Sequence, residues 1–163
     1  MNMLALDLGR TTGWATNMHG RIESGIQKFE LGRGESVGML YHLFNQFLHK
    51  FKYKFKLIMD GNTGFILNKI DLIVYEQTHQ RGGAATEQAA GYATRVQEFC
   101  VISEIECENV HTGTLKLFWT GHGNASKADM IAECKRRGFN PVDDNEADAI
   151  AILHWALDQY GGE

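Results

Sequence analysis

Residues Met3–Thr16 read MLALDLGRTTGWAT, a pattern typical of a buried strand followed by a tight turn. The apolar residues run directly into one carboxylate, Asp7, and a glycine-bearing turn then leads into a second strand. A buried carboxylate is costly unless a positive charge meets it, and a metal ion is the usual partner. The pattern therefore predicts a strand that delivers an acid to a site.

A second stretch repeats this arrangement. Residues 71–75, DLIVY, have the clearest buried-strand pattern in the chain, and Glu76 follows them directly. If this strand and the first lie side by side in one sheet, Asp7 and Glu76 meet at the same edge. In open α/β sheets, such an edge is where sites form.

Acids also crowd the start of the last expected helix, at about residues 144–159. Acids stabilise a helix N-terminus through the helix dipole, and this explains one or two of them. It does not explain Asp148, which lies where the helix becomes apolar on several sides. Residues three or four apart share a helix face, so Asp148 can act with Asn145 or Asp144, whereas Glu146 points elsewhere.

The rest of the chain predicts an α/β domain. Strands at about residues 13–18 and 24–31 would form an antiparallel meander with the first strand, and another strand is expected at 108–111. Helices are expected at about 35–50, 87–106 and 127–137, the last with Ser126 as its N-cap. Asp60–Gly64 marks an inserted hairpin or loop. The FKYKFK segment before it is either a basic ridge for nucleic acid or, as we favour, a solvated lysine face.

Composition indicates one soluble globular domain covering residues 1–163. No apolar run is long enough to cross a membrane, and no secretion signal is evident, so we expect a cytoplasmic protein. Cys100, Cys107 and Cys134 have no metal-ligand spacing and suit buried thiols in a reducing compartment. The net charge of −4 gives no general attraction to DNA, so DNA binding would need gathered lysines or bound cations.

Three acids thus converge: Asp7, Glu76 and Asp148. Neighbouring carboxylates repel each other unless cations lie between them, and oxygen-rich sites suit Mg²⁺ or Mn²⁺. Two such ions are the standard arrangement for phosphodiester hydrolysis. The expected chemistry is therefore metal-dependent cleavage of a nucleic acid.

Four motifs in this order resemble the RuvC-type Holliday-junction resolvases, crossover junction endodeoxyribonucleases of the ribonuclease H-like fold. LALDLGRTTGWA is similar to the family's first strand, LIVYEQ to the strand with its glutamate, and NEADAIAIL to its last helix. LKLFWTGHGNASK is similar to the segment that carries two lysines, here Lys116 and Lys127.

The resemblance implies a mixed five-stranded sheet flanked by helices and a homodimer that nicks a four-way junction symmetrically on two strands. Asp7, Glu76 and Asp148, with Asn145 or Asp144, would hold two Mg²⁺ ions, which Mn²⁺ could replace. Lys116 and Lys127 would contact the scissile phosphate and its neighbour. The helix at about 87–106 would form the dimer contact.

Two departures from the family pattern stand out. Asn145 occupies the position of an aspartate or histidine ligand, so Asp144 is an alternative fourth ligand. His79 replaces an aromatic wedge; we expect His79 and Arg81, in the glycine-rich stretch after Glu76, to contact DNA. The Phe51–Gly64 segment is longer than in bacterial members and has no assigned role. These differences suggest a divergent, phage-encoded branch acting in a bacterial or phage-infected cell.

The sequence is also compatible with three other functions. DLGRTTG also resembles the first phosphate loop of the actin and sugar-kinase family, although 163 residues leave no room for the second lobe of those proteins. The chain could instead be a junction-binding module with weakened catalysis, in keeping with Asn145. It could also be a nuclease for branched or flapped DNA in general.

Overall fold

The computed structural model describes residues 1–18, 20–52, 54–58, 64–77 and 84–162. Its centre is a five-stranded mixed sheet of order β3-β2-β1-β6-β7. β1, β2 and β3 are antiparallel, as the predicted meander requires, whereas β6 and β7 continue the sheet parallel to β1. The strand bounds are Met3–Asp7 (β1), Thr11–Thr16 (β2), Glu23–Lys28 (β3), Leu72–Glu76 (β6) and Glu106–Val110 (β7).

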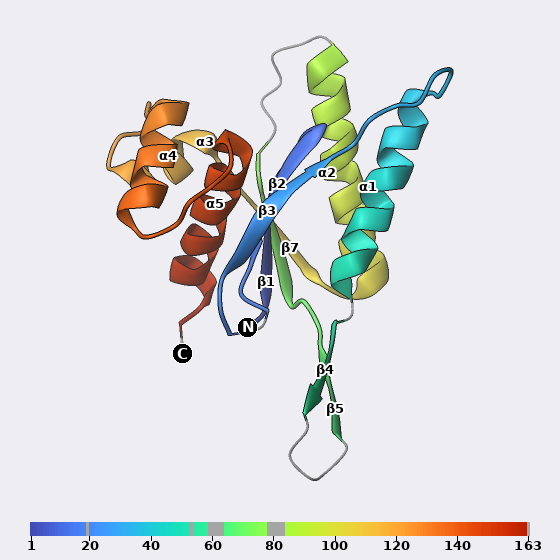
Figure 1. Cartoon of the computed structure of the whole chain (residues 1–163), viewed down its shortest axis with the longest axis horizontal. Helices are drawn as coiled ribbons and strands as arrows, with labels where there is room; N and C mark the ends of the chain where they lie inside the picture. The colour runs from blue at the N-terminus through green and yellow to red at the C-terminus, as the bar shows by residue number, and fades with distance from the viewer. Residues whose placement is uncertain (19, 53, 59–63, 78–83, 163) are drawn as a thin grey trace.

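Helices cover both faces of this sheet (Figure 1). α1 (Val37–Lys52) and α2 (Ala84–Ser103) pack together on one face. α5 (Asp144–Tyr160) crosses the other face against β1 and β2, and α3 (Thr112–Thr120) and α4 (Lys127–Arg136) pack against α5. The last helix begins at the predicted residue, and Ser126 caps α4 as expected; its partner in a capping box is Asp129.

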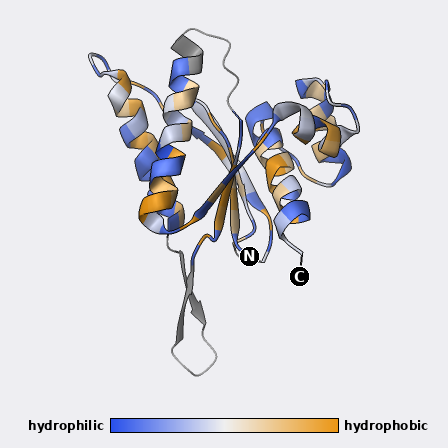
Figure 2. Ribbon diagram, turned by 180° about the vertical axis from the view of Figure 1, so that it is seen from behind, coloured by the Kyte–Doolittle hydropathy of each residue, from blue (hydrophilic) through white to orange (hydrophobic). Residues whose placement is uncertain are grey.

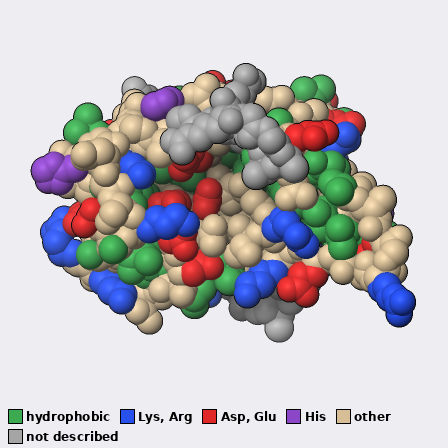
Figure 3. Space-filling view, turned by 90° about the horizontal axis from the view of Figure 1, so that it is seen from above, with side chains coloured by type: hydrophobic (Ala, Val, Ile, Leu, Met, Phe, Trp, Pro, Cys, Tyr) green, Lys and Arg blue, Asp and Glu red, His purple; other side chains and the backbone are tan. Residues whose placement is uncertain are grey.

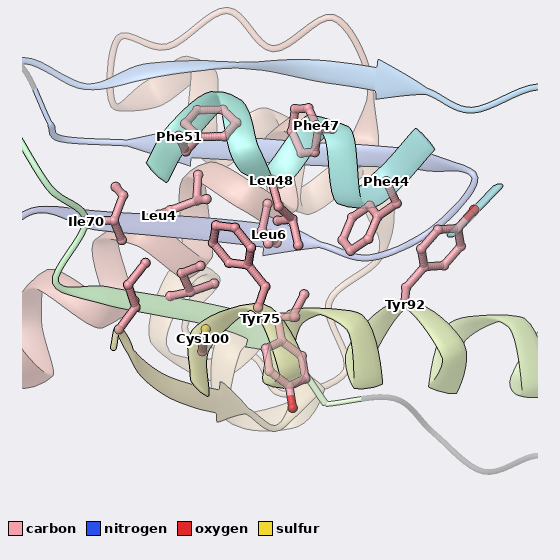
Figure 4. Packing of buried hydrophobic residues seen from close by; sticks show 14 of the residues in the cluster. Leu4, Leu6, Phe44, Phe47, Leu48, Phe51, Ile70, Tyr75, Tyr92 and Cys100 are labelled. Carbon is pink, nitrogen blue, oxygen red and sulfur yellow. The ribbon is translucent and has the colours of Figure 1, made fainter. Parts of the chain in front are cut away.

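Successive residues of the central strands pack into two separate hydrophobic cores, one on each face of the sheet. Leu4 and Leu6 of β1 point toward α1 and α2, where aromatic side chains of the helices enclose them (Figure 4). Met3 and Ala5 point the opposite way, toward α5. Figure 2 shows hydrophobic residues along the central strands and on the helices that face them. This alternation fixes which face each strand-end acid reaches.

Two helices differ from the sequence prediction. α2 ends at Ser103 rather than near residue 106, because Glu104 adopts a left-handed conformation (φ 53°) and Ile105 N–H turns back to the Cys100 carbonyl oxygen at 2.9 Å. Cys107 consequently lies in a strand. α3 was not predicted as a helix; it ends at Gly121, which has φ 81°.

The inserted segment forms a two-stranded hairpin of β4 (Lys54–Ile58) and β5 (Gly64–Asn68), one of the two predicted possibilities. It extends from the end of the molecule opposite the start of α2 (Figure 1). Within the described part of the chain, none of the helices has the length and apolar character to cross a membrane. Cys100 and Cys134 are buried and Cys107 is half-buried, in agreement with the prediction of interior thiols.

Candidate active site

Asp7 and Glu76 end two neighbouring parallel strands. The register of β1 and β6 pairs Ala5 with Val74 and Leu6 with Tyr75. Asp7 and Glu76 are the next residues of their strands, so they lie beside each other. Because side chains alternate along a strand, Asp7 shares the face of Ala5, and Glu76 shares that of Val74. That face is the one covered by α5. The structure therefore brings both strand-end acids to the same edge and the same face of the sheet.

The first turns of α5 meet this edge. Asp143 caps the helix by accepting a hydrogen bond from Glu146 N–H at 3.0 Å. Glu146 points away from the other acids, as expected: its carboxylate accepts hydrogen bonds from Ser24 Oγ at 2.7 Å and Val142 N–H at 2.8 Å. It thereby ties the start of α5 to β3. Asp144 and Asp148, on the first two turns of α5, lie near Asp7, because their charges contribute to its raised pKa.

Gly13 of β2 makes this approach possible. A Cβ atom at residue 13 would lie 1.8 Å from the backbone oxygen of Asn145 and 3.0 Å from the nitrogen of Glu146. No other residue type fits there without moving α5. Sequence reasoning did not single out Gly13, although a glycine within a strand is a signal of close backbone approach.

Burial and neighbouring charges both perturb the acids of this site. Burial raises the pKa of Asp148 to about 7, and the charges of Glu76 and Asp144 add to the rise. Burial likewise raises the pKa of Asp7 well above its usual range, with further contributions from Asp148, Glu76 and Asp144. In addition, Asp148 Oδ1 is buried and has no hydrogen-bond partner among the described residues. Without a cation, Asp7 and Asp148 are thus held toward their protonated forms, and a bound cation would favour their charged forms.

Both predicted lysines lie beside these acids. Lys127 Nζ forms an ion pair with Asp144, and its charge lowers the pKa of Asp7 and of Asp148. Lys116, on α3, also lowers the pKa of Asp148. Figure 3, which views the molecule from above, shows acidic side chains gathered beside Lys and Arg side chains. The side chain of Lys127 is 77% exposed, so it is able to turn toward a ligand outside the protein.

Sequence reasoning also missed Thr112. Its hydroxyl donates a hydrogen bond to Glu76 Oε1 at 2.5 Å. Nothing in the sequence marked it, because the contact depends on how α3 follows β7.

The two alternative fourth ligands differ in their surroundings. The side-chain amide of Asn145 donates a hydrogen bond to Asp143 Oδ2 at 3.1 Å, whereas the carboxylate of Asp144 pairs with Lys127. The predicted DNA contacts His79 and Arg81 lie outside the described residues, as do the side chains of the FKYKFK lysines at 54 and 56.

The donor set suits a hard divalent cation. Carboxylate oxygens are the ligands that Mg²⁺ and Mn²⁺ prefer, and the partnerless Asp148 Oδ1 is a buried acceptor of the required kind. Among the described residues, however, no three His, Cys, Asp or Glu side chains already converge on one point as a metal cluster. Binding a cation here would therefore require the acidic side chains to turn toward it.

This fold is the ribonuclease H-like fold of the Holliday-junction resolvases: it has their sheet order and flanking helices, and two of its parallel strands end in acids. Solved structures show the similarity directly. Thermus thermophilus RuvC has TM-scores of 0.61 alone and 0.63 in complex with a Holliday junction substrate. The structure of RuvC alone is 17% identical to this chain in sequence, and the match covers 99% of this chain and 97% of RuvC. The structure with the junction substrate is 15% identical, and the match covers 99% of this chain and 96% of RuvC.

The yeast mitochondrial Holliday junction resolvase has a TM-score of 0.58 at 13% identity, covering 97% of this chain and 80% of that chain. No protein-family model matches the sequence, and no curated protein matches it. The predicted fold is therefore confirmed by structural similarity, although the sequence identities are too low for the sequence comparisons to find a match.

Proposed function

We propose that this protein is a metal-dependent endodeoxyribonuclease that resolves four-way DNA junctions, with residues 1–163 acting as one nuclease domain. The main support is that Asp7 and Glu76 end neighbouring strands on the face covered by α5, where burial, followed by the charges of neighbouring acids, raises the pKa of Asp7 and Asp148. A site of several carboxylates beside two lysines is suited to cations and phosphates together.

In this proposal, Asp7, Glu76 and Asp148 hold two Mg²⁺ ions, with Mn²⁺ able to replace them. When bound, such ions supply an activated water and stabilise the leaving 3′ oxygen. Lys116 and Lys127 bind the scissile phosphate and its neighbour and orient the phosphodiester for attack. Water is the nucleophile, so no covalent intermediate forms.

Asp144 is the better candidate for the fourth ligand. It carries a full charge, and that charge contributes to the raised pKa of both Asp7 and Asp148. The Asn145 amide is instead hydrogen-bonded to Asp143. We therefore expect Asp144→Asn to raise the Mg²⁺ concentration needed for half-maximal cleavage more than Asn145→Ala does. If Asn145→Ala had an equal or larger effect, Asn145 and not Asp144 would be the fourth ligand.

The proposed partners are branched DNA and a second copy of the chain. T. thermophilus RuvC has been solved with a Holliday junction substrate, and this chain shares its fold. α2 exposes Val101 (80%) and Ile102 (68%), apolar side chains that a dimer contact would cover. A homodimer with two such sites would nick opposing strands symmetrically. Bound cations would offset the net charge of −4 at the DNA surface.

Cleavage of a mobile four-way junction, beside flap, fork and duplex substrates of the same sequence, tests this function. We expect Mg²⁺-dependent nicks at symmetric positions on two opposing strands, with the junction cut fastest. Comparable rates on all branched substrates would favour a broader branched-DNA nuclease. Junction binding without cleavage in Mg²⁺ or Mn²⁺ would favour a binding module.

A further inference from the structure

The hydrogen bond between Thr112 and Glu76 links two parts of the candidate site. Thr112 Oγ1 donates to Glu76 Oε1, and the two residues belong to different elements, α3 and β6. A hydrogen bond to one oxygen restricts the rotation of a carboxylate and so sets where its other oxygen points. Such partners, one step removed from a metal, commonly decide how well its ligands are oriented.

The backbone holds Thr112 in this place. β6 and β7 are parallel neighbours, with Glu76 opposite Val110, and the Gln77 N–H donates to the Val110 carbonyl at 2.8 Å. Two residues after Val110 the chain has already entered α3, whose N-cap His111 accepts a hydrogen bond from Gly113 N–H at 3.1 Å. The Thr112 hydroxyl therefore reaches Glu76 from a capped helix start and not from a free loop.

α3 also carries Lys116, one turn beyond Thr112. Residues four apart share a helix face, so the hydroxyl that contacts Glu76 and the lysine that lowers the pKa of Asp148 belong to one rigid turn. Leu115 and Trp119 anchor this helix in the core beneath α5. The orientation of Glu76 is thus tied to the element that presents the lysine.

We propose that Thr112 is a positioning residue that orients Glu76 for cation binding. This inference rests on the proposed role of Glu76 as a metal ligand. Loss of the hydroxyl leaves Glu76 in place but free to rotate, so cation affinity falls while the fold and the DNA-binding surface are kept. Residues in this kind of supporting role typically contribute about 10- to 100-fold in metal affinity or activity.

The test compares Thr112→Val with Thr112→Ser and with Thr114→Val. Valine keeps the shape of threonine without its hydroxyl, serine keeps the hydroxyl, and Thr114 is an exposed residue of the same helix. Mn²⁺ alone is titrated by calorimetry, and junction cleavage is followed against Mg²⁺ concentration. We expect Thr112→Val to weaken Mn²⁺ binding and to raise the Mg²⁺ requirement by about 10- to 100-fold. The other two variants should match the parent, and all should melt within a few degrees of it.

Parent-like Mn²⁺ affinity in Thr112→Val would overturn the inference, as would a Thr112→Ser variant as weak as the valine one, since packing would then be what matters. If Thr112→Val fails to fold, Thr112→Ala is measured in its place, with the same expectation. A parent that binds Mn²⁺ but cuts no DNA would refute the proposed nuclease function, and the affinity comparison would still decide the role of Thr112.

Discussion

Asp148→Asn should stabilise the metal-free protein at mildly alkaline pH. The pKa of Asp148 is about 7 in the folded protein, against an ordinary value of 3.8. The folded state therefore binds a proton that the unfolded state has lost, and between these two values the free energy of unfolding falls as pH rises. Above the folded-state pKa, the full cost of ionising Asp148 acts against folding.

The size of this cost follows from the two pKa values. The interval from 3.8 to about 7, at about 1.4 kcal/mol for each pH unit, corresponds to about 4 kcal/mol. Asparagine removes the charge but leaves a polar amide in a place where Oδ1 has no partner among the described residues, which costs about 1–3 kcal/mol. We expect a net gain of about 1–3 kcal/mol, or several degrees in Tm for a chain of this length.

Thermal unfolding in EDTA measures this gain. The parent, Asp148→Asn and the control Asp158→Asn, an exposed acid on the same helix, are compared at about pH 5 and pH 8. The gain should appear at the higher pH and largely vanish at the lower one, where Asp148 is protonated; Asp158→Asn should show neither effect. Added Mg²⁺ should raise the Tm of the parent more than that of Asp148→Asn. A variant no more stable than the parent at the higher pH would refute this reasoning.

Three further changes probe the surroundings of the site. Gly13→Ala should lower the free energy of unfolding by about 1–3 kcal/mol in urea titrations, because its Cβ meets the Asn145 backbone at 1.8 Å; unchanged stability would contradict this packing. Lys127→Ala should reduce junction cleavage by about 100-fold with less than about 1 kcal/mol lost in stability, since its ion pair is exposed; parent-like cleavage would exclude a role for this lysine. Burial lowers the pKa of His154, so this histidine contributes stability that is lost as pH falls below 6.5. His154→Phe should lose less stability on acidification than the parent does, and a variant with the parent's pH profile would argue against this effect.

The placement of Asp7 and Glu76 could be predicted because each ends a strongly patterned strand. Asp7 and Glu76 follow apolar runs that only a buried strand explains, and parallel pairing then requires them to meet. The supporting residues could not be predicted in the same way. Thr112 matters only because α3 starts beside the end of β6, and Gly13 only because α5 crosses β2 at that point. Such contacts join residues far apart in sequence and leave no periodic signal.

The two helix predictions that were wrong, the missing α3 and the end of α2, have the same physical cause. α3 has nine residues and depends on its caps and on the burial of Leu115 and Trp119, so its apolar repeat is too short to recognise. The end of α2 depends on the left-handed Glu104, a residue type that does not usually mark a helix end. Both features are decided by tertiary packing and not by local propensity.

Asp7→Asn tests most directly whether carboxylate-bound cations cleave the DNA at this site. Burial raises the pKa of Asp7, the charges of Asp148, Glu76 and Asp144 add to the rise, and asparagine preserves its size while removing its charge. We predict that Asp7→Asn binds a mobile four-way junction as the parent does, yet cleaves it at least about 100-fold more slowly in saturating Mg²⁺. Cleavage by Asp7→Asn at the parent rate would contradict the account.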